Sequence, residues 1–315
     1  MLFAGTTSIF SFKYSLYNDK VKKLKQRSLS AVNIYNVIND DSETLRNETI
    51  KKTKYINFVS VHEPNHKKPV NDEQFGYYIA GLIDGDGHFS SKQQLIIVFN
   101  SSDVSLAYFI KKKIGFGIVR KVKNKNAHIL VIANKEGLEK IIKLINGKIR
   151  TENKLNQITN NILNHNKFME LKKQIDLKLN LDNDLKNHWL AGFSDADASF
   201  QIKILDRKKI GKKVEVRLNF QIDQKKNNLL LLIKNFFGGN IGYRKNQDTY
   251  YYGSTSFGSA KNVIHYFDNF HLLSTKHINY LKWRKAYIII QNKDHLTEDG
   301  IKKIIKLKNT MNKLS

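Results

Sequence analysis

The chain repeats a short motif, and this repeat restricts the folds that it can adopt. The segment FGYYIAGLIDGDGHF (75–89) returns as NHWLAGFSDADASF (187–200). Farther along, IKKKIGFG (110–117) is answered by IKNFFGGN (233–240). Each of these later segments reads as an apolar helix end that closes on glycine, as helix C-termini prefer. The sequence therefore predicts two related folded units in one chain.

The repeat and the local composition divide the chain into five segments. Residues 1–74 are basic and polar, hold both prolines and are expected to be poorly ordered. The two copies span 75–165 and 187–290, joined by a linker at 166–186, and a basic tail follows at 291–315. The first thirty residues contain serine and few acids, which suits either a mitochondrial presequence or a frayed basic arm.

Each copy predicts the order helix, two strands, helix, two strands, helix, so the expected fold class is α+β. The second copy shows this best in VEVRLNFQI (214–222), where apolar and polar residues alternate with the period of a half-buried strand. The first copy is less regular, because QQLIIVFN (93–100) is apolar on both faces. The second copy is also longer, and the basic stretch ILDRKKIGKK (204–213) is the obvious place for its extra residues.

Charge indicates the class of partner. The chain has 54 Lys and Arg against 28 Asp and Glu, a formal net charge of +26. Such a chain repels itself, which favours a polyanionic partner: DNA or RNA first, and an anionic membrane surface second. No apolar run approaches the roughly 18–20 residues that cross a bilayer. The absence of cysteine excludes disulfides, thiolate zinc sites and a cysteine nucleophile.

The core of the repeat reads IAGLIDGDG (79–87) and LAGFSDADA (190–198). Both segments predict an apolar helix that contains glycine, although glycine inside a helix costs about 1 kcal/mol relative to alanine. Close approach of two helix backbones would offset this cost, because small residues permit contact that larger side chains forbid. We therefore expect the two repeated helices to pack against each other on a pseudo-twofold axis.

Each repeated helix ends in two aspartates one residue apart, Asp84 with Asp86 and Asp195 with Asp197. Negative side chains there face the negative end of the helix dipole. If the helices run side by side, the carboxylates converge, and divalent cations, magnesium above all, would offset their repulsion. Carboxylates that hold metal ions against a phosphodiester match metal-assisted hydrolysis. The alternative is that the aspartates only end helices in polar loops, but their repetition in so basic a chain favours the metal site.

These motifs resemble the LAGLIDADG homing endonucleases, in the single-chain form with two motifs that organellar group I introns encode. The likeness covers roughly residues 72–290. It implies two αββαββα units, each with a saddle-shaped antiparallel sheet in the DNA major groove, and motif helices at the domain interface. It also implies that Asp86 and Asp197 are catalytic and bind magnesium, while Asp84 and Asp195 support the helix ends.

The resemblance implies a catalytic glutamine at the end of the second strand of each copy. Gln224 occupies this position in the second copy, whereas the first copy offers Ser101, with Asn100 beside it as a substitute. The two centres are therefore expected to be unequal. Ala198 stands where glycine is usual in the family, and this departure could strain the turn.

A catalytic lysine is implied near the start of the last helix of each copy. In the second copy this residue is Lys276. The first copy leaves three candidates open: Lys148, Arg150 and Lys154. The plainer interpretation of any one of them is a phosphate contact or a solvated side chain.

Basic and amide side chains on the predicted strands and hairpins are candidates for DNA contacts. Arginine reads guanine and amides read adenine, so Arg217, Asn219 and Gln221 are the candidates for base contacts. Basic hairpins would neutralise phosphates, so affinity should fall steeply with salt. The remaining candidates are Arg207, Lys208, Lys209, Arg120, Lys121 and Arg244.

The sequence thus predicts a monomeric, magnesium-dependent, site-specific double-strand DNA endonuclease that promotes group I intron mobility. The alternative is an RNA maturase that assists the splicing of its host intron, and the sequence does not separate the two. A regulator that only binds DNA is disfavoured, since both acids are present. An intein is disfavoured as well, because this sequence has no Cys and no terminal His-Asn. The abundance of Lys, Asn and Ile suits an AT-rich mitochondrial genome.

Overall fold

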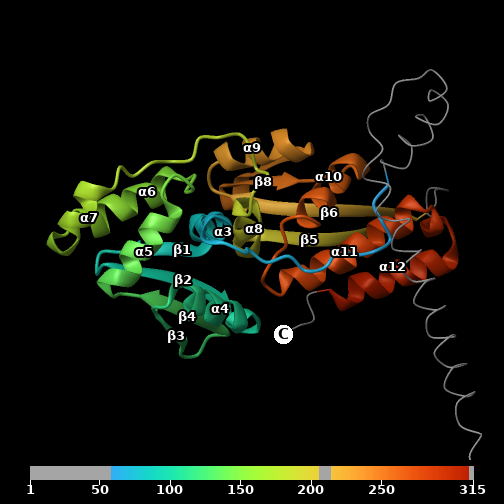
Figure 1. Ribbon diagram of the computed structural model, residues 1–315. Coiled ribbons are helices and arrows are strands. Elements are labelled where there is room, and N and C mark those ends of the chain that lie inside the picture. The colour runs from blue at the N-terminus through green and yellow to red at the C-terminus, as the bar shows by residue number, and fades with distance from the viewer. Residues whose placement is uncertain (1–57, 206–213, 312–315) are drawn as a thin grey trace, which may run out of the picture. The chain divides into compact units, whose positions relative to one another are not determined.

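The computed structural model describes residues 58–205 and 214–311 (Figure 1). Three predicted DNA contacts, Arg207, Lys208 and Lys209, lie outside the described residues. The described part from Val59 onward belongs to one compact unit. No helix in these described ranges is long and apolar enough to cross a membrane.

The first half has the predicted order of elements. They are α3 (Asp72–Asp86), β1 (Gly87–Ser90), β2 (Gln94–Asn100), α4 (Val104–Ile114), β3 (Ile118–Lys121), β4 (Ala127–Ile132) and α5 (Lys135–Ile145). The strands form one antiparallel sheet in the order β1-β2-β4-β3. A further helix, α6 (Glu152–Ile158), follows and continues as a π-helical turn, Thr159–Leu163.

The second half repeats this order. Its elements are α8 (Trp189–Asp197), β5 (Ala198–Leu205), β6 (Glu215–Gln224), α9 (Asn228–Phe237), β7 (Asn240–Arg244), β8 (Thr249–Gly253), α10 (Phe257–Phe267) and α11 (Lys276–Gln291). The sheet order β5-β6-β8-β7 matches that of the first half. The prediction of an α+β fold built from two αββαββα units is confirmed.

Local sequence accounts for the ends of several helices. The Asn71 side chain caps α3 by accepting a hydrogen bond from the backbone N–H of Gln74 at 2.9 Å. Helix α4 ends at Gly115 with φ 87°, and α9 ends at Gly238 with φ 75°, both in the region that favours glycine. The predicted glycine ends of these two helices are therefore confirmed.

Strand β6 follows the alternation that its sequence predicts. Leu218, Phe220 and Ile222 are buried, while Arg217 and Asp223 on the other face are exposed. In the first half, β2 buries its alternate residues in the same way. Its outer face remains apolar, because Ile96 is only half-buried and Val98 is 47% exposed.

Helices α3 and α8 pack against each other at the junction of the two halves (Figure 1). A Cβ atom added at Gly81 would lie 1.9 Å from the carbonyl oxygen of Trp189. One added at Gly192 would lie 1.9 Å from the carbonyl oxygen of Tyr78. Only glycine fits at either crossing, so the predicted close approach of the two motif helices is confirmed.

Three segments outside the repeats contain contacts or helices that the sequence did not indicate. Residues 59–71, expected to be poorly ordered, run along α11, where the Val59 N–H donates to Gln291 Oε1 at 2.8 Å. The linker 166–186 contains α7 (Met169–Gln174). The basic tail 291–315 contains α12 (Glu298–Thr310), which contacts α11 and β5. These segments lack the repeat, so periodicity gave no sign of their contacts.

Candidate active site

The first aspartate of each motif supports the helix end, and Asp84 does so in the first half. Its buried carboxylate accepts hydrogen bonds from the backbone N–H groups of Arg150 and Thr151, at 2.9 and 3.2 Å. It also accepts from the Thr151 hydroxyl at 2.5 Å and from the Trp189 indole at 2.8 Å. Burial raises the pKa of Asp84 to about 6, against the pull of these hydrogen bonds.

Asp195 has the corresponding role in the second half. It accepts hydrogen bonds from the Tyr78 hydroxyl and the Leu273 N–H, both at 2.7 Å. The Ser274 N–H and hydroxyl donate to it at 3.3 and 2.5 Å. In each half, then, the first aspartate binds the residues just before a later helix, α6 in the first half and α11 in the second. Each of these aspartates also accepts one hydrogen bond from the motif helix of the other half.

The second aspartate of each motif, Asp86 or Asp197, is accessible to a ligand. Asp86 is exposed and Asp197 is half-buried. A Cβ atom added at Gly85 would lie 3.0 Å from Asp197 Oδ2, so the two helix ends are close together. Partial burial, and then the charge of Asp197, raise the pKa of Asp86 to about 6, and burial raises the pKa of Asp197. The structure thus brings the two predicted metal ligands together.

Two lysines approach this pair of carboxylates, one from each half. The Lys276 ammonium donates to the backbone carbonyls of Ala196 and Ser194, at 2.6 and 3.2 Å. The Lys154 ammonium donates to the carbonyl of Gly87 at 2.5 Å. Burial lowers the pKa of both lysines. The charge of the first aspartate of the same half, and then the charges of both second aspartates, oppose that shift.

Of the three first-half candidates, Lys154 is therefore the one that faces the predicted centre. Arg150 points elsewhere and donates to the carbonyls of Asp182 and Asp184. Lys148 lies over the ring of Tyr77.

Gln224 also reaches the centre, since its amide donates to Asp197 Oδ2 at 2.7 Å. The register shows what corresponds to it in the first half: Gly87 pairs with Ile97, as Ala198 pairs with Ile222, so Phe99 matches Gln224. Among the described residues no hydrogen bond to Asp86 replaces that of Gln224. The sequence had placed Ser101 at this position, and the shift of two residues became visible only with the strand pairing.

The expected strain at Ala198 is wrong. Its φ of −89° and ψ of 157° are those of extended backbone, which any residue adopts. Gly87 at the corresponding position has a similar conformation, with φ −77° and ψ 149°.

Comparison with known sequences identifies the family of this chain. The sequence profile of the LAGLIDADG endonuclease family matches residues 79–165 and 190–287. The chain belongs to the LAGLIDADG endonuclease family. The family that the sequence resembles is thereby confirmed, and so is the expected class of enzyme, a DNA endonuclease.

Relatives of this LAGLIDADG chain are encoded in introns. An uncharacterised cox1 intron-2 protein of Schizosaccharomyces pombe is 63% identical and covers 97% of this chain and 95% of its own length. The intron-encoded DNA endonuclease aI3 of Saccharomyces cerevisiae is 28% identical over 71% of this chain and 65% of its own length. The intron-encoded RNA maturase bI4 of the same yeast is 28% identical over 73% of this chain but 36% of its own length.

Solved structures share the fold. The I-LtrWI LAGLIDADG homing endonuclease, solved with its target DNA, has a TM-score of 0.59 and 24% identity, and covers 78% of this chain and 99% of its own. Meganuclease I-SmaMI, solved with uncleavable DNA, has a TM-score of 0.60 and 23% identity over 78% of this chain and 99% of its own. Both likenesses concern the arrangement of the two LAGLIDADG halves.

A hollow of about 170 Å³ beside Asp86 adds one residue that sequence reasoning missed. Asp103, in the first half, lines it together with Asn100 and Lys276. The Asp103 carboxylate accepts a hydrogen bond from the backbone N–H of Thr275 at 2.6 Å and so anchors the start of α11 across the two halves. Asp103 lies in the turn between β2 and α4, where no periodic signal would have identified this contact.

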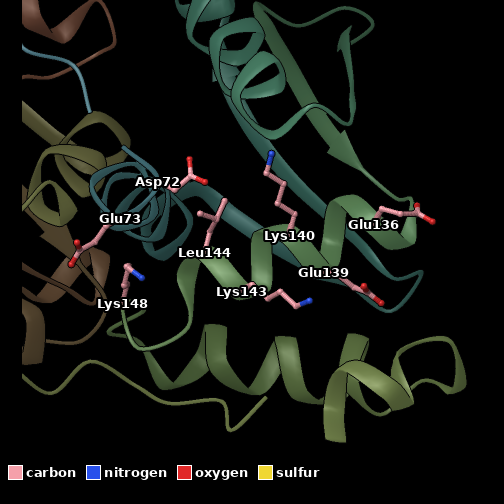
Figure 2. A pocket seen from close by; sticks show the side chains of 8 residues that line it. All are labelled: Asp72, Glu73, Glu136, Glu139, Lys140, Lys143, Leu144 and Lys148. Carbon is pink, nitrogen blue, oxygen red and sulfur yellow. The ribbon is translucent and has the colours of Figure 1, made fainter. Parts of the chain in front are cut away.

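A second hollow lies away from the LAGLIDADG carboxylates, between the start of α3 and α5 (Figure 2). Asp72 and Glu73 of α3 line it, and α5 contributes Glu139 and Lys143. Its mixed charges and its distance from the second aspartates of the motifs separate it from the candidate active site.

The candidate base contacts lie on the outer face of β6. Arg217 is exposed and pairs with Glu215 at 2.5 Å, and Gln221 is half-buried. Asn219 lies between them but is only 5% exposed, and its amide donates to Gln221 Oε1 at 3.2 Å and Gln201 Oε1 at 3.3 Å. Gln201 of β5 is thus a more accessible amide that sequence reasoning missed.

The candidate phosphate contacts on the described strands differ in whether their side chains already bind a partner within the protein. Arg120 and Lys121 are exposed on β3. Arg244 of β7 is held by the protein itself: it pairs with Asp223 at 3.0 Å and lies over the Tyr251 ring, 4.5 Å from its centroid. Arg120 and Lys121 are therefore readily available to a polyanion, while Arg244 must first exchange an intramolecular partner.

Gln224 gives the first testable prediction. Replacing it with alanine removes the hydrogen bond that orients Asp197, and we expect about a tenfold loss of cleavage rate, the scale typical of residues that orient metal ligands. Single-turnover cleavage at saturating protein measures the effect. The matched variant Asn100→Ala should lose less, because the Asn100 side chain binds Ser102 rather than Asp86. Equal losses would contradict the inequality of the two centres.

Proposed function

We propose that this LAGLIDADG protein is a site-specific double-strand DNA endonuclease that hydrolyses phosphodiester bonds with divalent cations and promotes the mobility of its intron. The observation that carries the proposal is the convergence of Asp86 and Asp197 at the adjoining ends of two helices that contact each other through glycine. Two negative groups at the negative ends of helix dipoles are tolerated best where cations share the space.

The donor set fits a hard cation such as Mg²⁺. Accessible carboxylates come from Asp86 and Asp197, and magnesium prefers oxygen ligands and keeps several waters. When bound, the ion would supply an activated water and stabilise the leaving oxygen. Gln224 orients the Asp197 carboxylate, while Lys154 and Lys276 hold the backbone next to each second aspartate. The two lysines also add positive charge where a scissile phosphate would lie.

The outer faces of the two sheets would bind the duplex. Arg217, Gln221 and Gln201 would contact bases, and Arg120 and Lys121 would contact phosphates. With the net charge of +26, this predicts a steep decrease in affinity with salt. We propose that one chain suffices, since its two halves already supply both aspartates.

An RNA maturase that assists its host group I intron is the second candidate. The relative that favours it is the maturase bI4, to which this chain is 28% identical. Restoration of splicing in vitro by a chain that lacks both second aspartates would establish this role. This result would not test the nuclease proposal, which depends on the cleavage assay.

The intron of the fission yeast relative lies in cox1, which supports a mitochondrial location and a target at a cox1 exon junction. The decisive experiment incubates the full chain with intronless cox1 DNA from its own source, with Mg²⁺ and with EDTA. We expect double-strand cleavage of the intronless DNA with Mg²⁺ and no cleavage with EDTA. DNA of the same locus that contains the intron should not be cleaved under either condition. If no exon junction of the source genome is cut with Mg²⁺ or Mn²⁺, the nuclease proposal fails.

The raised pKa of Asp86 predicts how magnesium and pH interact. A pKa of about 6 means that Asp86 is protonated below that pH and is then unable to bind a cation. The Mg²⁺ concentration for half-maximal cleavage should therefore increase as pH falls, by up to about tenfold per pH unit below the pKa. Titrations of Mg²⁺ between about pH 7.5 and about pH 5.5 measure this. A midpoint that does not change over this range would contradict the role of Asp86 as a ligand.

A further inference from the structure

Three histidines from separate segments meet on the second half, outside the candidate active site. His66 lies on the segment before α3, His271 in the loop between α10 and α11, and His277 in the first turn of α11. One ring nitrogen of each lies within 4.8 Å of the others. The ring centroid of His66 lies 5.0 Å from that of His271 and 4.6 Å from that of His277.

We propose that His66, His271 and His277 form a binding site for a transition-metal ion, zinc above all, which fastens the segment before α3 to the second half. Nothing in the candidate active site requires this group. Its ligands are imidazole nitrogens only, which suit zinc and related ions, whereas magnesium prefers oxygen. Three histidines and one open position are a common arrangement for zinc.

The hydrogen bonds leave nitrogen lone pairs for a metal. His66 Nε2 lies 3.0 Å from the carbonyl oxygen of Leu272, so this nitrogen donates and Nδ1 keeps its lone pair. His277 Nδ1 is buried and has no hydrogen-bond partner. A histidine that binds metal through one nitrogen usually donates through the other to a carbonyl oxygen, as His66 is placed to do.

His271 must exchange one partner to bind. Its Nδ1 accepts a hydrogen bond from the backbone N–H of Lys67 at 2.9 Å, and its Nε2 lies 3.2 Å from the carbonyl oxygen of Asp268. Binding through Nδ1 replaces the contact with Lys67 and keeps the one with Asp268. Lys67 follows His66 directly, so the metal would connect the same two segments that this hydrogen bond connects.

The spacing and the protonation state both suit a metal. In a tetrahedral site with Zn–N distances of about 2.1 Å, two ligand nitrogens lie about 3.4 Å apart. The three ring nitrogens, now within 4.8 Å of one another, would therefore move closer by up to about 1.4 Å when the ion binds. Burial and the neighbouring histidines lower the pKa of His277 to about 4, and burial lowers that of His271. At neutral pH these rings are therefore uncharged, which is the form that binds metal ions.

The position gives the site a structural role. The segment before α3 runs beside α11 (Figure 1). The Arg284 guanidinium of α11 donates to the carbonyls of Ser60 and His62 in this segment, at 3.0 and 3.2 Å. His277 follows Lys276, and the loop of His271 includes Ser274, which binds Asp195. A metal at the three histidines would thus hold the start of α11 as well as the preceding segment.

Metal binding to the full chain tests the proposal, and it requires neither DNA nor cleavage. The chain, without a polyhistidine tag and stripped by a chelator, is titrated with Co²⁺ and then with Zn²⁺. We expect one equivalent to bind, with the visible absorption of tetrahedral Co²⁺, which Zn²⁺ removes and excess Mg²⁺ does not. The unfolding temperature should increase with Zn²⁺, since the metal binds the folded state.

Variants of two exposed histidines on the same segment provide the comparison. His66→Ala should weaken the affinity for Zn²⁺ by about tenfold or more and abolish the thermal shift. His62→Ala, four residues earlier and outside the group, should retain both. Circular dichroism without metal shows that each variant is folded. If His66→Ala binds as tightly as the unaltered chain, or if the unaltered chain gives no tetrahedral Co²⁺ spectrum, the three rings are only a packed histidine group and the proposal is wrong.

Discussion

Replacement of Asp86 or Asp197 by asparagine is expected to reduce double-strand cleavage by about 10³-fold or more, the scale on which residues that act as one catalytic unit fail when one is lost. Asparagine keeps the shape of aspartate but removes the negative charge that a divalent cation requires. Both side chains are accessible at the helix ends, so the substitutions leave the buried core unchanged. Single-turnover assays on a cognate duplex, with nicked and linear products separated, measure the loss.

DNA binding distinguishes a failure of chemistry from a failure of folding. Both variants should bind the duplex at least as tightly as the unaltered chain when EDTA removes divalent cations, because each removes a negative charge from a surface that meets phosphates. Asp176→Asn is the matched control, since that exposed aspartate lies on the linker and, among the described residues, forms its ion pair with Lys178. Cleavage at the parental rate by either active-site variant would exclude its aspartate from the reaction.

The largest effect on stability is expected from Gly81→Ala or Gly192→Ala. Each added methyl group would lie 1.9 Å from a carbonyl oxygen of the opposite motif helix, and a backbone atom inside a packed interface moves only if the helices separate. We expect the free energy of unfolding to decrease by about 3 kcal/mol, the upper part of the usual range for an overpacked core. Urea denaturation followed by circular dichroism measures it.

Gly258→Ala is the matched control for this prediction. Gly258 also lies inside a helix, α10, but a Cβ atom there meets nothing within 4 Å. Alanine should therefore leave stability unchanged or increase it by up to about 1 kcal/mol, through its higher helix propensity. A similar decrease at Gly258 and at the two motif glycines would show that the crossing of α3 and α8 is not responsible for the loss.

The parts of the site that the sequence predicted are those that repeat. Two copies of a glycine-bearing helix that ends in aspartates predicted the crossing at Gly81 and Gly192 and the proximity of Asp86 to Asp197. Strict alternation predicted the two faces of β6. In each case a physical requirement, close backbone contact or one buried strand face, determines the residue types at a fixed spacing.

What remained unpredicted depends on pairings between distant residues. The counterpart of Gln224 is set by the register of β1 with β2, which no local pattern encodes. The choice of Lys154 over Lys148 and Arg150 follows from its contact with the carbonyl of Gly87, which lies 67 residues earlier in the chain. The burial of Asn219 depends on Gln201 of the next strand, although its own strand marks it as outward-facing.

The histidines show the same limit. His66 lies more than two hundred residues before His271 and His277 in the chain. Nothing in the sequence around His66 distinguishes it from His62. Only the contact of the segment before α3 with α11 brings the three rings together.

The hydrogen bonds from Trp189 to Asp84 and from Tyr78 to Asp195 cross between the halves in both directions. A chimera that joins either half to a foreign partner would leave one carboxylate short of a donor unless the incoming helix carries an indole or a phenol at the corresponding position. New recognition specificities obtained by recombining halves are therefore compatible with this scaffold only where that reciprocal pair is transplanted too.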